Sequence, residues 1–358
     1  MTVQGIPSPG DGLRLHLNEN TGGCSDRVMD AIRAMRATDI SAYPDYRRDV
    51  TAVARHFGVD PDWLVLTNGL DEGIFLSSIG TFGRAHDASL EAIVPVPAFD
   101  PYLTATAAMD ARTIRVPPGS DFAFPADAVV AAITPKTRLI FLNTPNNPTG
   151  RAIPHGVLHR IAAAAPQATV VVDEAYVEFA DPEPGQQSAS FLDELPRHSN
   201  VLVGRTFSKA YGLAGIRIGV LIGHPDRLEP IRAVTPVFNM NTVAMTAMHA
   251  ALADTAFLPT YVTDVHTSRE RLYAACERLG LEHWPSAANF VLMRVGPRAG
   301  EVVAHLAASG VHVRDRSEDL YSPGCIRVTA CIASHTDRAI AALEAVVAAG
   351  LTSARSQS

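Results

Sequence analysis

The strongest constraint on the fold is an alternation of short apolar runs with amphipathic segments between residues 63 and 222. Continuous apolar strands separated by helices are typical of a largely parallel sheet that helices cover on both faces. We therefore predict an α/β fold. The predicted strands are 63–66, 91–94, 138–142, 168–172, 201–203 and 216–222, and the predicted helices among them are 71–82, 101–109 and 155–165.

The pattern of the sequence changes near residue 240. Two long helices rich in alanine and arginine are expected between residues 242 and 280, followed by shorter strands alternating with helices. We predict a large domain of residues 42–240 and a smaller α+β domain of residues 1–41 and 241–358, because the N-terminal segment is too short to bury a core alone. The remaining expectations are irregular structure at 1–25, helices at 26–37, 49–57, 300–309 and 336–349, and strands at 290–294, 311–314 and 326–329.

The composition excludes several classes of protein. A net charge of −7 gives no basic face for nucleic acid. We find no basic-then-apolar leader and no run of about 18 apolar residues, so no membrane segment is predicted. The four cysteines have neither metal-site nor disulfide spacing, which favours reduced thiols and a cytoplasmic protein. His155 and His159 lie on one predicted helix without a third ligand, so we expect a solvated face and no metal site.

Only two of the 30 basic residues are lysines, Lys136 and Lys209. A Schiff base needs a primary amine, which arginine lacks, so an aldehyde cofactor has two possible anchors. Lys136 lies in a polar turn, as surface lysines commonly do. Lys209 follows an apolar strand and lies among hydroxyl groups and glycines. We therefore predict that Lys209 is the anchor.

Polar groups follow four of the predicted strands. Ligands of open α/β sheets bind beyond the carboxyl ends of the strands, so these groups are expected to face one ligand. The groups are a helix N-terminus at Gly69, Leu70 and Asp71, the amide of Asn147, the carboxylate of Asp173 with the phenol of Tyr176, and the amine of Lys209. This set suits an anionic, heteroaromatic aldehyde, and pyridoxal phosphate has these properties.

The phosphate of this cofactor is expected at the helix N-terminus of residues 69–71, where free N–H groups favour an anion. Further donors to it are expected from Thr206, Ser208 and Arg217. Asp173 is expected to pair with the ring nitrogen and to keep it protonated. Taken alone, Asp173 also suits a helix cap and Arg217 a surface ion pair, but their order at successive strand ends favours a cofactor site.

The remaining candidates surround the ring. Asn147 and Tyr176 are expected to donate to the phenolate oxygen, and Phe99, which alone suits a core position, is expected to lie flat on the ring. Lys209 would bind the aldehyde and then move the α-proton of the substrate. The usual lysine pKa of about 10.4 is too high for that base at neutral pH. Cationic surroundings and partial burial are expected to lower it.

Three motifs resemble those of fold-type I pyridoxal-phosphate aminotransferases, and within them the histidinol-phosphate aminotransferase group. They are Asn146-Asn-Pro-Thr-Gly150, Val172-Asp-Glu-Ala-Tyr-Val-Glu-Phe179 and Arg205-Thr-Phe-Ser-Lys-Ala-Tyr-Gly-Leu-Ala-Gly-Ile-Arg-Ile-Gly219. The likeness spans nearly the whole chain. It implies a large, mostly parallel sheet of the seven-stranded type and a smaller α+β domain. It also implies transfer of an amino group between an amino acid, or an amino phosphate like histidinol phosphate, and a 2-oxo acid.

The terminal motifs carry further implications of the resemblance. Leu17-Asn-Glu-Asn20 is similar to the N-terminal segment of the group and makes Asn20 a candidate for substrate binding. Tyr43 matches a tyrosine whose phenol reaches the cofactor phosphate of the other subunit, which implies a homodimer. Arg327 matches the clamp for the substrate α-carboxylate, and Arg314 matches the residue that binds the far end of the substrate. Arg314 also suits an ion pair with Asp315 or Glu318.

Departures from the group concern the substrate. Thr21-Gly22-Gly23 replaces a segment that usually contains proline, Leu70 is large for its turn, and the acidic Glu318-Asp319 follows the arginine motif. Three alternatives therefore stay open. They are an aminotransferase for aromatic or specialised-pathway amino acids, a decarboxylase or lyase of the threonine-phosphate decarboxylase type, and a module that binds the cofactor only to sense a metabolite.

Overall fold

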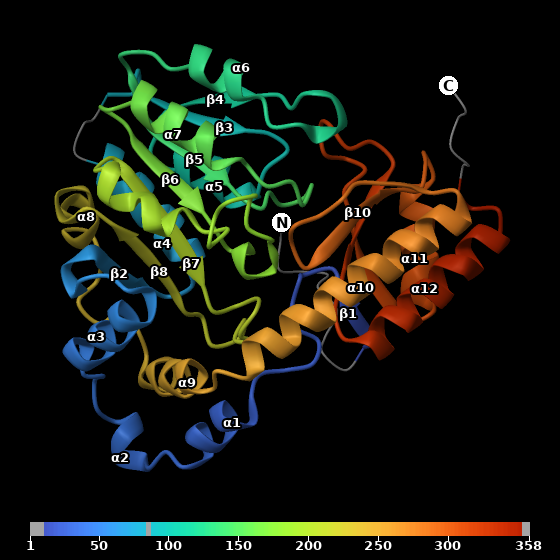
Figure 1. Cartoon of the computed structure of the whole chain (residues 1–358), viewed down its shortest axis with the longest axis horizontal. Helices are drawn as coiled ribbons and strands as arrows, with labels where there is room; N and C mark the ends of the chain where they lie inside the picture. The colour runs from blue at the N-terminus through green and yellow to red at the C-terminus, as the bar shows by residue number, and fades with distance from the viewer. Residues whose placement is uncertain (1–10, 84–86, 353–358) are drawn as a thin grey trace.

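A large sheet of seven strands forms the centre of the computed structural model, which describes residues 11–83 and 87–352 (Figure 1). Its order is β2-β8-β7-β6-β5-β3-β4, and only β8 runs antiparallel to its neighbours. The α/β fold with a mostly parallel sheet is thereby confirmed. The strands are β2 (Leu64–Thr67), β3 (Glu91–Pro95), β4 (Arg112–Val116), β5 (Thr137–Asn143), β6 (Thr169–Asp173), β7 (Val201–Thr206) and β8 (Gly219–Gly223).

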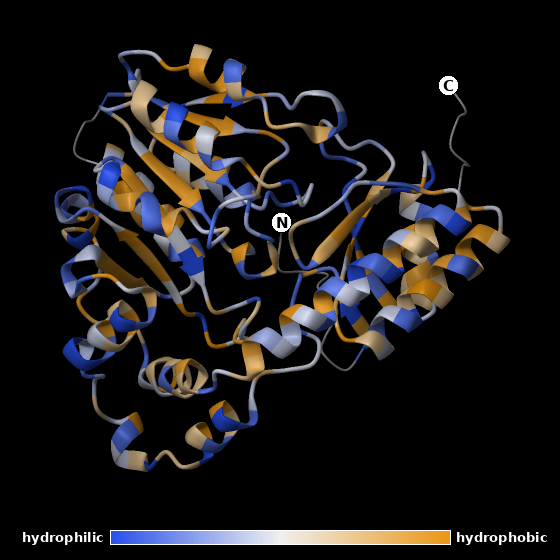
Figure 2. Cartoon of the chain, in the orientation of Figure 1, coloured by the Kyte–Doolittle hydropathy of each residue, from blue (hydrophilic) through white to orange (hydrophobic). Residues whose placement is uncertain are grey.

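Helices cover both faces of this sheet because its central strands are apolar on both sides (Figure 2). In β5, Leu139 and Phe141 pack in one core, whereas Ile140 and Leu142 pack in the other, as the alternation of side chains in a strand requires. The first core includes α4 (Leu70–Phe82), α5 (Asp100–Ala107) and α8 (Pro225–Arg232). The second includes α3 (Tyr46–Phe57), α6 (Ala126–Ala131) and α7 (His155–Ala164).

A second sheet of five strands has the order β1-β11-β12-β10-β9. Its strands are β1 (Leu13–Leu15), β9 (Glu282–His283), β10 (Phe290–Arg294), β11 (Val311–Asp315) and β12 (Cys325–Thr329). The helices α10 (Phe257–Leu279), α11 (Ala299–Ala308) and α12 (Ala333–Ala348) lie on one face of it (Figure 1). The prediction of irregular structure up to residue 25 was wrong for β1, which pairs in parallel with β11. A three-residue strand is too short to show a period in the sequence.

The remaining helices are α1 (Asp26–Arg33), α2 (Ala37–Ile40) and α9 (Thr242–Ala253). The single helix predicted at 26–37 is therefore interrupted, and α1 packs against α9 beside the large sheet (Figure 1). Among the described residues, β4, β9, α6 and α8 were not predicted. The strand β4 lies at an edge and is mostly accessible, so it lacks a continuous apolar run. The domain boundaries given above stay predictions.

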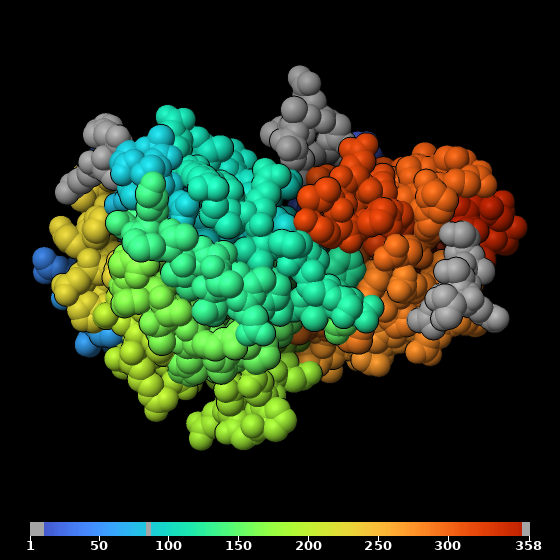
Figure 3. All heavy atoms as spheres, turned by 90° about the horizontal axis from the view of Figure 1, so that it is seen from above, coloured from blue at the N-terminus to red at the C-terminus, as the bar shows by residue number. Residues whose placement is uncertain are grey.

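The two sheets are joined by direct contacts between the segment near residue 120–150 and the C-terminal third of the chain (Figure 3). Phe122 packs edge-to-face on Trp284 with ring centroids 4.8 Å apart. The backbone N–H of Ala287 donates to the carbonyl of Gly150 at 2.8 Å. The carboxyl ends of the central parallel strands and one face of the small sheet therefore meet in a shared region.

Candidate active site

Lys209 follows β7 and lies at the junction of the two sheets. Its Nζ donates to the carbonyl of Leu17 at 2.9 Å and lies 6.0 Å from the ring centroid of Tyr176. Burial and, to a smaller extent, the charge of Arg327 lower the pKa of Lys209 to about 8. The expected direction is thus confirmed, with burial as the larger cause. Lys136 is exposed, in agreement with the surface position predicted for it.

The buried carboxylate of Asp173 ends strand β6. One oxygen accepts from the N–H of Ala175 at 2.9 Å, and the other accepts from the phenol of Tyr102 at 2.5 Å. Burial raises the pKa of Asp173 to about 6, while the hydrogen bond from Tyr102 opposes that rise. An ionised carboxylate held at the end of a strand can pair with a protonated ring nitrogen.

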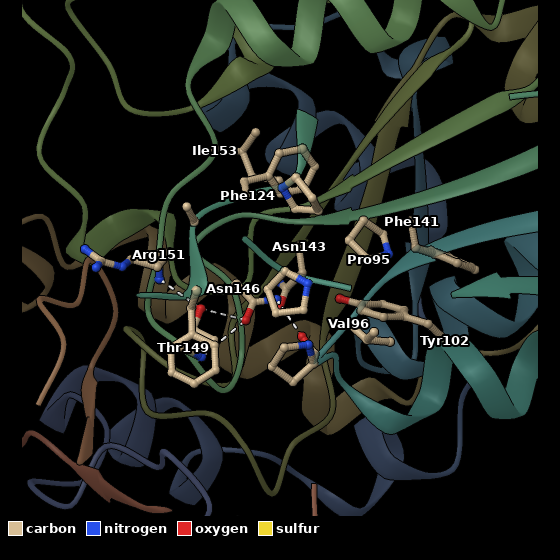
Figure 4. A pocket seen from close by; sticks show the side chains of 15 residues that line it. Pro95, Val96, Tyr102, Phe124, Phe141, Asn143, Asn146, Thr149, Arg151 and Ile153 are labelled. Atoms are coloured by element: carbon tan, nitrogen blue, oxygen red, sulfur yellow. Dashed lines mark hydrogen bonds between the residues drawn. The ribbon is translucent and has the colours of Figure 1, made fainter. Parts of the chain in front are cut away.

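Tyr102 is a site residue that the sequence analysis missed. It lies on α5, is 1% exposed and stacks on Phe141 with ring centroids 4.8 Å apart (Figure 4). A buried tyrosine needs a partner for its hydroxyl group, but the burial of Tyr102 is evident only in the folded chain. The cavity beside Tyr102, with a volume of about 30 Å³, has room for one water molecule rather than a substrate.

The N-terminus of α4 forms an open cradle for an anion. Gly69 is the cap residue with φ 78°, and no side chain caps the first N–H groups of the helix. A Cβ atom on Gly69 would collide with the guanidinium of Arg217. Arg217 donates to Asp71 at 2.9 Å and to Ser208 at 3.3 Å, so its charge lies at the helix end. The side chain of Leu70 is buried in the core and leaves the cradle open.

Thr206 is placed differently from the other donors expected at the phosphate. Its hydroxyl group donates to the carbonyl of Ile218 at 3.3 Å and accepts from the N–H of Ser208 at 3.1 Å. The hydroxyl proton is therefore used within the turn that carries Ser208. The role of Thr206 as a phosphate donor stays a prediction.

Asn147 and Tyr176 lie between the two sheets. Asn147 accepts a short hydrogen bond from Nη1 of Arg327, and Tyr176 accepts from Nδ2 of Asn18 at 3.1 Å. Both side chains are buried, and Asn18 is a second residue that the sequence analysis did not single out. Phe99 precedes α5 and meets the ring of Tyr102 edge-to-face at 5.9 Å.

Two arginines occupy the face of the small sheet that points to Lys209. Arg327 is 5% exposed and also donates through Nη2 to the carbonyl of His16 at 2.7 Å. Burial lowers the pKa of Arg327 to about 10. Arg314 is its direct cross-strand neighbour and is half-buried. Among residues 11–83 and 87–352 no ion pair or hydrogen bond of Arg314 is found, so the alternative pairing with Asp315 or Glu318 is not observed.

The two acidic residues Glu318 and Asp319 have different surroundings, since Glu318 is exposed and Asp319 is partly buried. Asp319 forms an ion pair with the buried Arg316, which offsets its charge. Asn20 is also buried, and its Oδ1 accepts from the N–H of Gly22 at 2.9 Å. Within the described part of the chain its Nδ2 has no partner.

Tyr43 lies apart from the cluster around Lys209. It is 73% exposed and stacks on Phe238, itself exposed, with ring centroids 3.8 Å apart. The predicted solvated face was wrong for His155, which is buried and bonded to the carbonyl of Ala189 at 3.1 Å. No group of three or more metal-ligating side chains occurs in residues 11–83 and 87–352, and no helix in those ranges is long and apolar enough to cross a membrane.

Residues 10–345 match the model of the family "Aminotransferase class I and II". The chain belongs to this family. It is 36% identical to histidinol-phosphate aminotransferase 1 of Cupriavidus pinatubonensis, over 93% of this chain and 87% of that protein. It is 37% identical to histidinol-phosphate aminotransferase 2 of Ralstonia nicotianae, over 94% of this chain and 89% of that protein.

Solved structures agree with this assignment. The histidinol-phosphate aminotransferase of Sinorhizobium meliloti in complex with pyridoxal-5'-phosphate has a TM-score of 0.84 at 28% identity, covering 94% of this chain and 91% of that chain. The L-threonine-O-3-phosphate decarboxylase of Porphyromonas gingivalis has a TM-score of 0.79 at 21% identity, over 94% of this chain and 99% of that chain, which shows a shared fold alone. The protein is therefore a fold-type I aminotransferase that uses pyridoxal phosphate and resembles the histidinol-phosphate group.

The residues present fit this cofactor. The amine with a pKa of about 8, the buried carboxylate of Asp173 and the uncapped N-terminus of α4 lie after β7, β6 and β2. We call the residues at and beyond the carboxyl ends of β2, β3, β5, β6 and β7 the cofactor side. We call the facing residues of β1, β11 and β12, with the segment after β1, the substrate side.

Proposed function

We propose that this aminotransferase takes its amino group from histidinol phosphate or a closely related amino phosphate and passes it to a 2-oxo acid. One observation carries the proposal, the adjacency of Arg314 and Arg327 on neighbouring strands. In histidinol phosphate a CH₂–O–phosphate group replaces the carboxylate of an amino acid. That group is longer than a carboxylate and carries more charge, so it suits two adjacent guanidinium groups better than one.

The cofactor side would hold pyridoxal phosphate through the α4 cradle with Arg217 and Ser208, and through Asp173 at the ring nitrogen. Asn147 and Tyr176 would lie at the phenolate oxygen, and Phe99 on the ring. When bound, this cofactor supplies an electron sink that weakens the Cα–H bond of the substrate. Lys209 supplies the base, and burial brings its pKa close enough to neutrality for that task.

The substrate side would orient the reacting carbon. Arg327 is fixed by Asn147 and by the carbonyl of His16, so its guanidinium presents a defined edge to an incoming anion. An anion held there fixes the position of the attached carbon relative to Lys209, which is the positioning that proton transfer requires. Asn20 would contribute its free Nδ2 as a further donor to the substrate.

The test is a half-reaction without acceptor. The purified holoenzyme is mixed with histidinol phosphate, histidinol, histidine or phenylalanine, and the cofactor spectrum is followed while released carbon dioxide is measured. We expect histidinol phosphate to convert the cofactor to its amine form at the lowest concentration, without carbon dioxide. Conversion by phenylalanine alone would favour the aromatic alternative, and carbon dioxide release would favour the decarboxylase.

We further propose a homodimer. Tyr43 is exposed and stacks on Phe238 rather than on any residue around Lys209, which suits a phenol that serves the site of a second copy. Removal of one hydrogen bond to a phosphate in the Tyr43→Phe variant is expected to weaken retention of pyridoxal phosphate about tenfold. Equilibrium dialysis measures this, and sedimentation checks that the chain stays dimeric. Unchanged retention of pyridoxal phosphate would show that the phenol of Tyr43 does not contact the cofactor phosphate. The cytoplasmic location stays a prediction.

A further inference from the structure

One face of the small sheet is apolar, whereas the other carries arginine and histidine side chains. Leu13, Leu15, Val311, Val313 and Ile326 point to the helices α10, α11 and α12 and belong to the main core. Side chains alternate along a strand, so Arg14, His312, Arg314 and Arg327 point to the opposite face. His16 follows directly after β1, and its ring lies near that of His312 on this face. This second face is the substrate side, because Arg327 reaches Asn147 from it.

Two of these side chains form a pair across the sheet, and His16 lies beside them. Arg314 and Arg327 are paired directly across β11 and β12. The pairing of β1 with β11 ends at Leu15 and Val313, and His16 is the next residue, whose ring feels the charges of both Arg314 and Arg327. Like charges directly opposite one another destabilise a sheet unless a counter-ion lies between them. His16 therefore adds one imidazole ring beside the arginine pair, and its carbonyl accepts from Arg327.

His16 has no partner for either ring nitrogen in the described part of the chain, although the residue is 6% exposed. Its ring lies 6.2 Å from that of His312. The charged and titratable groups that face it are Arg14 on β1, His312 and Arg314 on β11, and Arg327 on β12, all of them cationic or neutral. Buried polar groups are nearly always hydrogen-bonded, so this imidazole lacks the partner its position calls for.

We propose that His16 is a substrate-specificity residue that hydrogen-bonds the phosphate monoester of the donor beside Arg314. The inference rests on the proposed function and adds a residue to it. A phosphate group has three peripheral oxygens, so it can engage Arg327, Arg314 and His16 together, whereas a carboxylate has two. Burial, and then the neighbouring positive charges, lower the pKa of His16 to about 4. The neutral ring therefore donates one N–H, and an anion placed there raises its pKa.

Single-turnover kinetics of the holoenzyme test the proposal. In His16→Ala we expect the apparent Kd for histidinol phosphate to rise about tenfold, the loss of one charge-assisted hydrogen bond. The maximal rate and the values for histidinol should change less than about twofold, because histidinol lacks the phosphate. His16→Gln, which keeps a donor, should recover part of the loss. The matched control is His305→Gln on α11, on the other side of the sheet. Equal losses for histidinol phosphate and histidinol would overturn the proposal.

A second measurement does not depend on turnover. In holoenzyme labelled at histidine, the NMR signal that disappears in His16→Gln reports the titration of His16. Added inorganic phosphate should raise that midpoint by at least about one pH unit, and an unmoved midpoint contradicts the proposal. If wild-type enzyme retains borohydride-trapped cofactor but does not react with histidinol phosphate, the proposed function fails, while the phosphate titration still decides the role of His16.

Discussion

On the cofactor side, both oxygens of Asp173 have donors and Arg217 has three partners. On the substrate side, Arg314 and the ring of His16 have none among the described residues. A single molecule occupies the first region throughout the reaction, so its groups can be fixed before binding. The second region must receive an amine donor and then a 2-oxo acid in turn. The unpaired guanidinium of Arg314 and the neutral ring of His16 are suited to anions of different length, although Arg314 and Arg327 repel one another across the sheet.

The largest effect is expected from a substitution on the cofactor side, at the residue that we assign as anchor and base. Lys209→Ala should lower the rate of the half-reaction by at least about 10⁴-fold, because both the covalent anchor and the base are lost. Lys136→Ala is the matched control and should be unchanged. Borohydride reduction followed by peptide mapping should place the label on Lys209. A label on Lys136 would contradict the assignment of the anchor.

Arg327→Lys tests the substrate side. A lysine cannot keep the forked contacts to Asn147 and to an anion together, so KM for the donor should rise about 100-fold with a smaller change in kcat. Binding of pyridoxal phosphate should be unaffected, since Arg327 belongs to the other region. The control is Arg298→Lys, whose surface pair with Glu301 is far from the site. If Arg327→Lys weakened the binding of pyridoxal phosphate as well as that of the donor, the cofactor side and the substrate side would not be functionally independent.

The pH dependence of cofactor attachment to apoenzyme has the next largest effect. Only the unprotonated amine attacks the aldehyde, and the pKa of Lys209 is about 8. The rate should rise about fifty-fold between pH 6 and pH 8 and level off above that range. A free lysine derivative in the same buffers corrects for changes in the aldehyde. A rate that climbs to pH 10 would show that Lys209 is not perturbed by burial.

Tyr102→Phe should have the smallest effect. The hydrogen bond from Tyr102 lowers the pKa of Asp173, so without it the pKa rises above about 6 and less carboxylate is ionised. Retention of pyridoxal phosphate should fall by less than about tenfold at pH 7, and by more at pH 6 than at pH 8. Equilibrium dialysis across this pH range is the measurement. Tyr273→Phe, which removes a hydroxyl bonded to Ser286, is the control, and a pH-independent loss would contradict the argument.

The two regions also differ in how far the sequence predicts them. Asp173 ends an apolar strand, and Asn147 and Lys209 lie in the turns that follow two others. The carboxyl ends of parallel strands meet at one edge of the sheet, so the local sequence pattern was enough to predict that these residues lie together. Arg314 and Arg327 were identified as candidate substrate-binding residues only through the resemblance to a family. Tyr102 and His16 were missed, because their significance depends on burial and on partners distant in sequence. Leu13–Leu15 was missed as a strand because its pairing with β11 exists only in the folded chain.

That pairing has a consequence for biosynthesis. Arg327 donates to the carbonyl of His16 across 311 positions of sequence, and β1 can join its sheet only after β11 has been made. As the chain leaves the ribosome, the large sheet can form first. The strand β1 cannot pair until β11, in the last quarter of the polypeptide, has been made. A nascent chain that stalls after β8 would therefore lack Arg327 and the burial that it helps to provide, so the lowered pKa of Lys209 is expected only after the substrate side has formed.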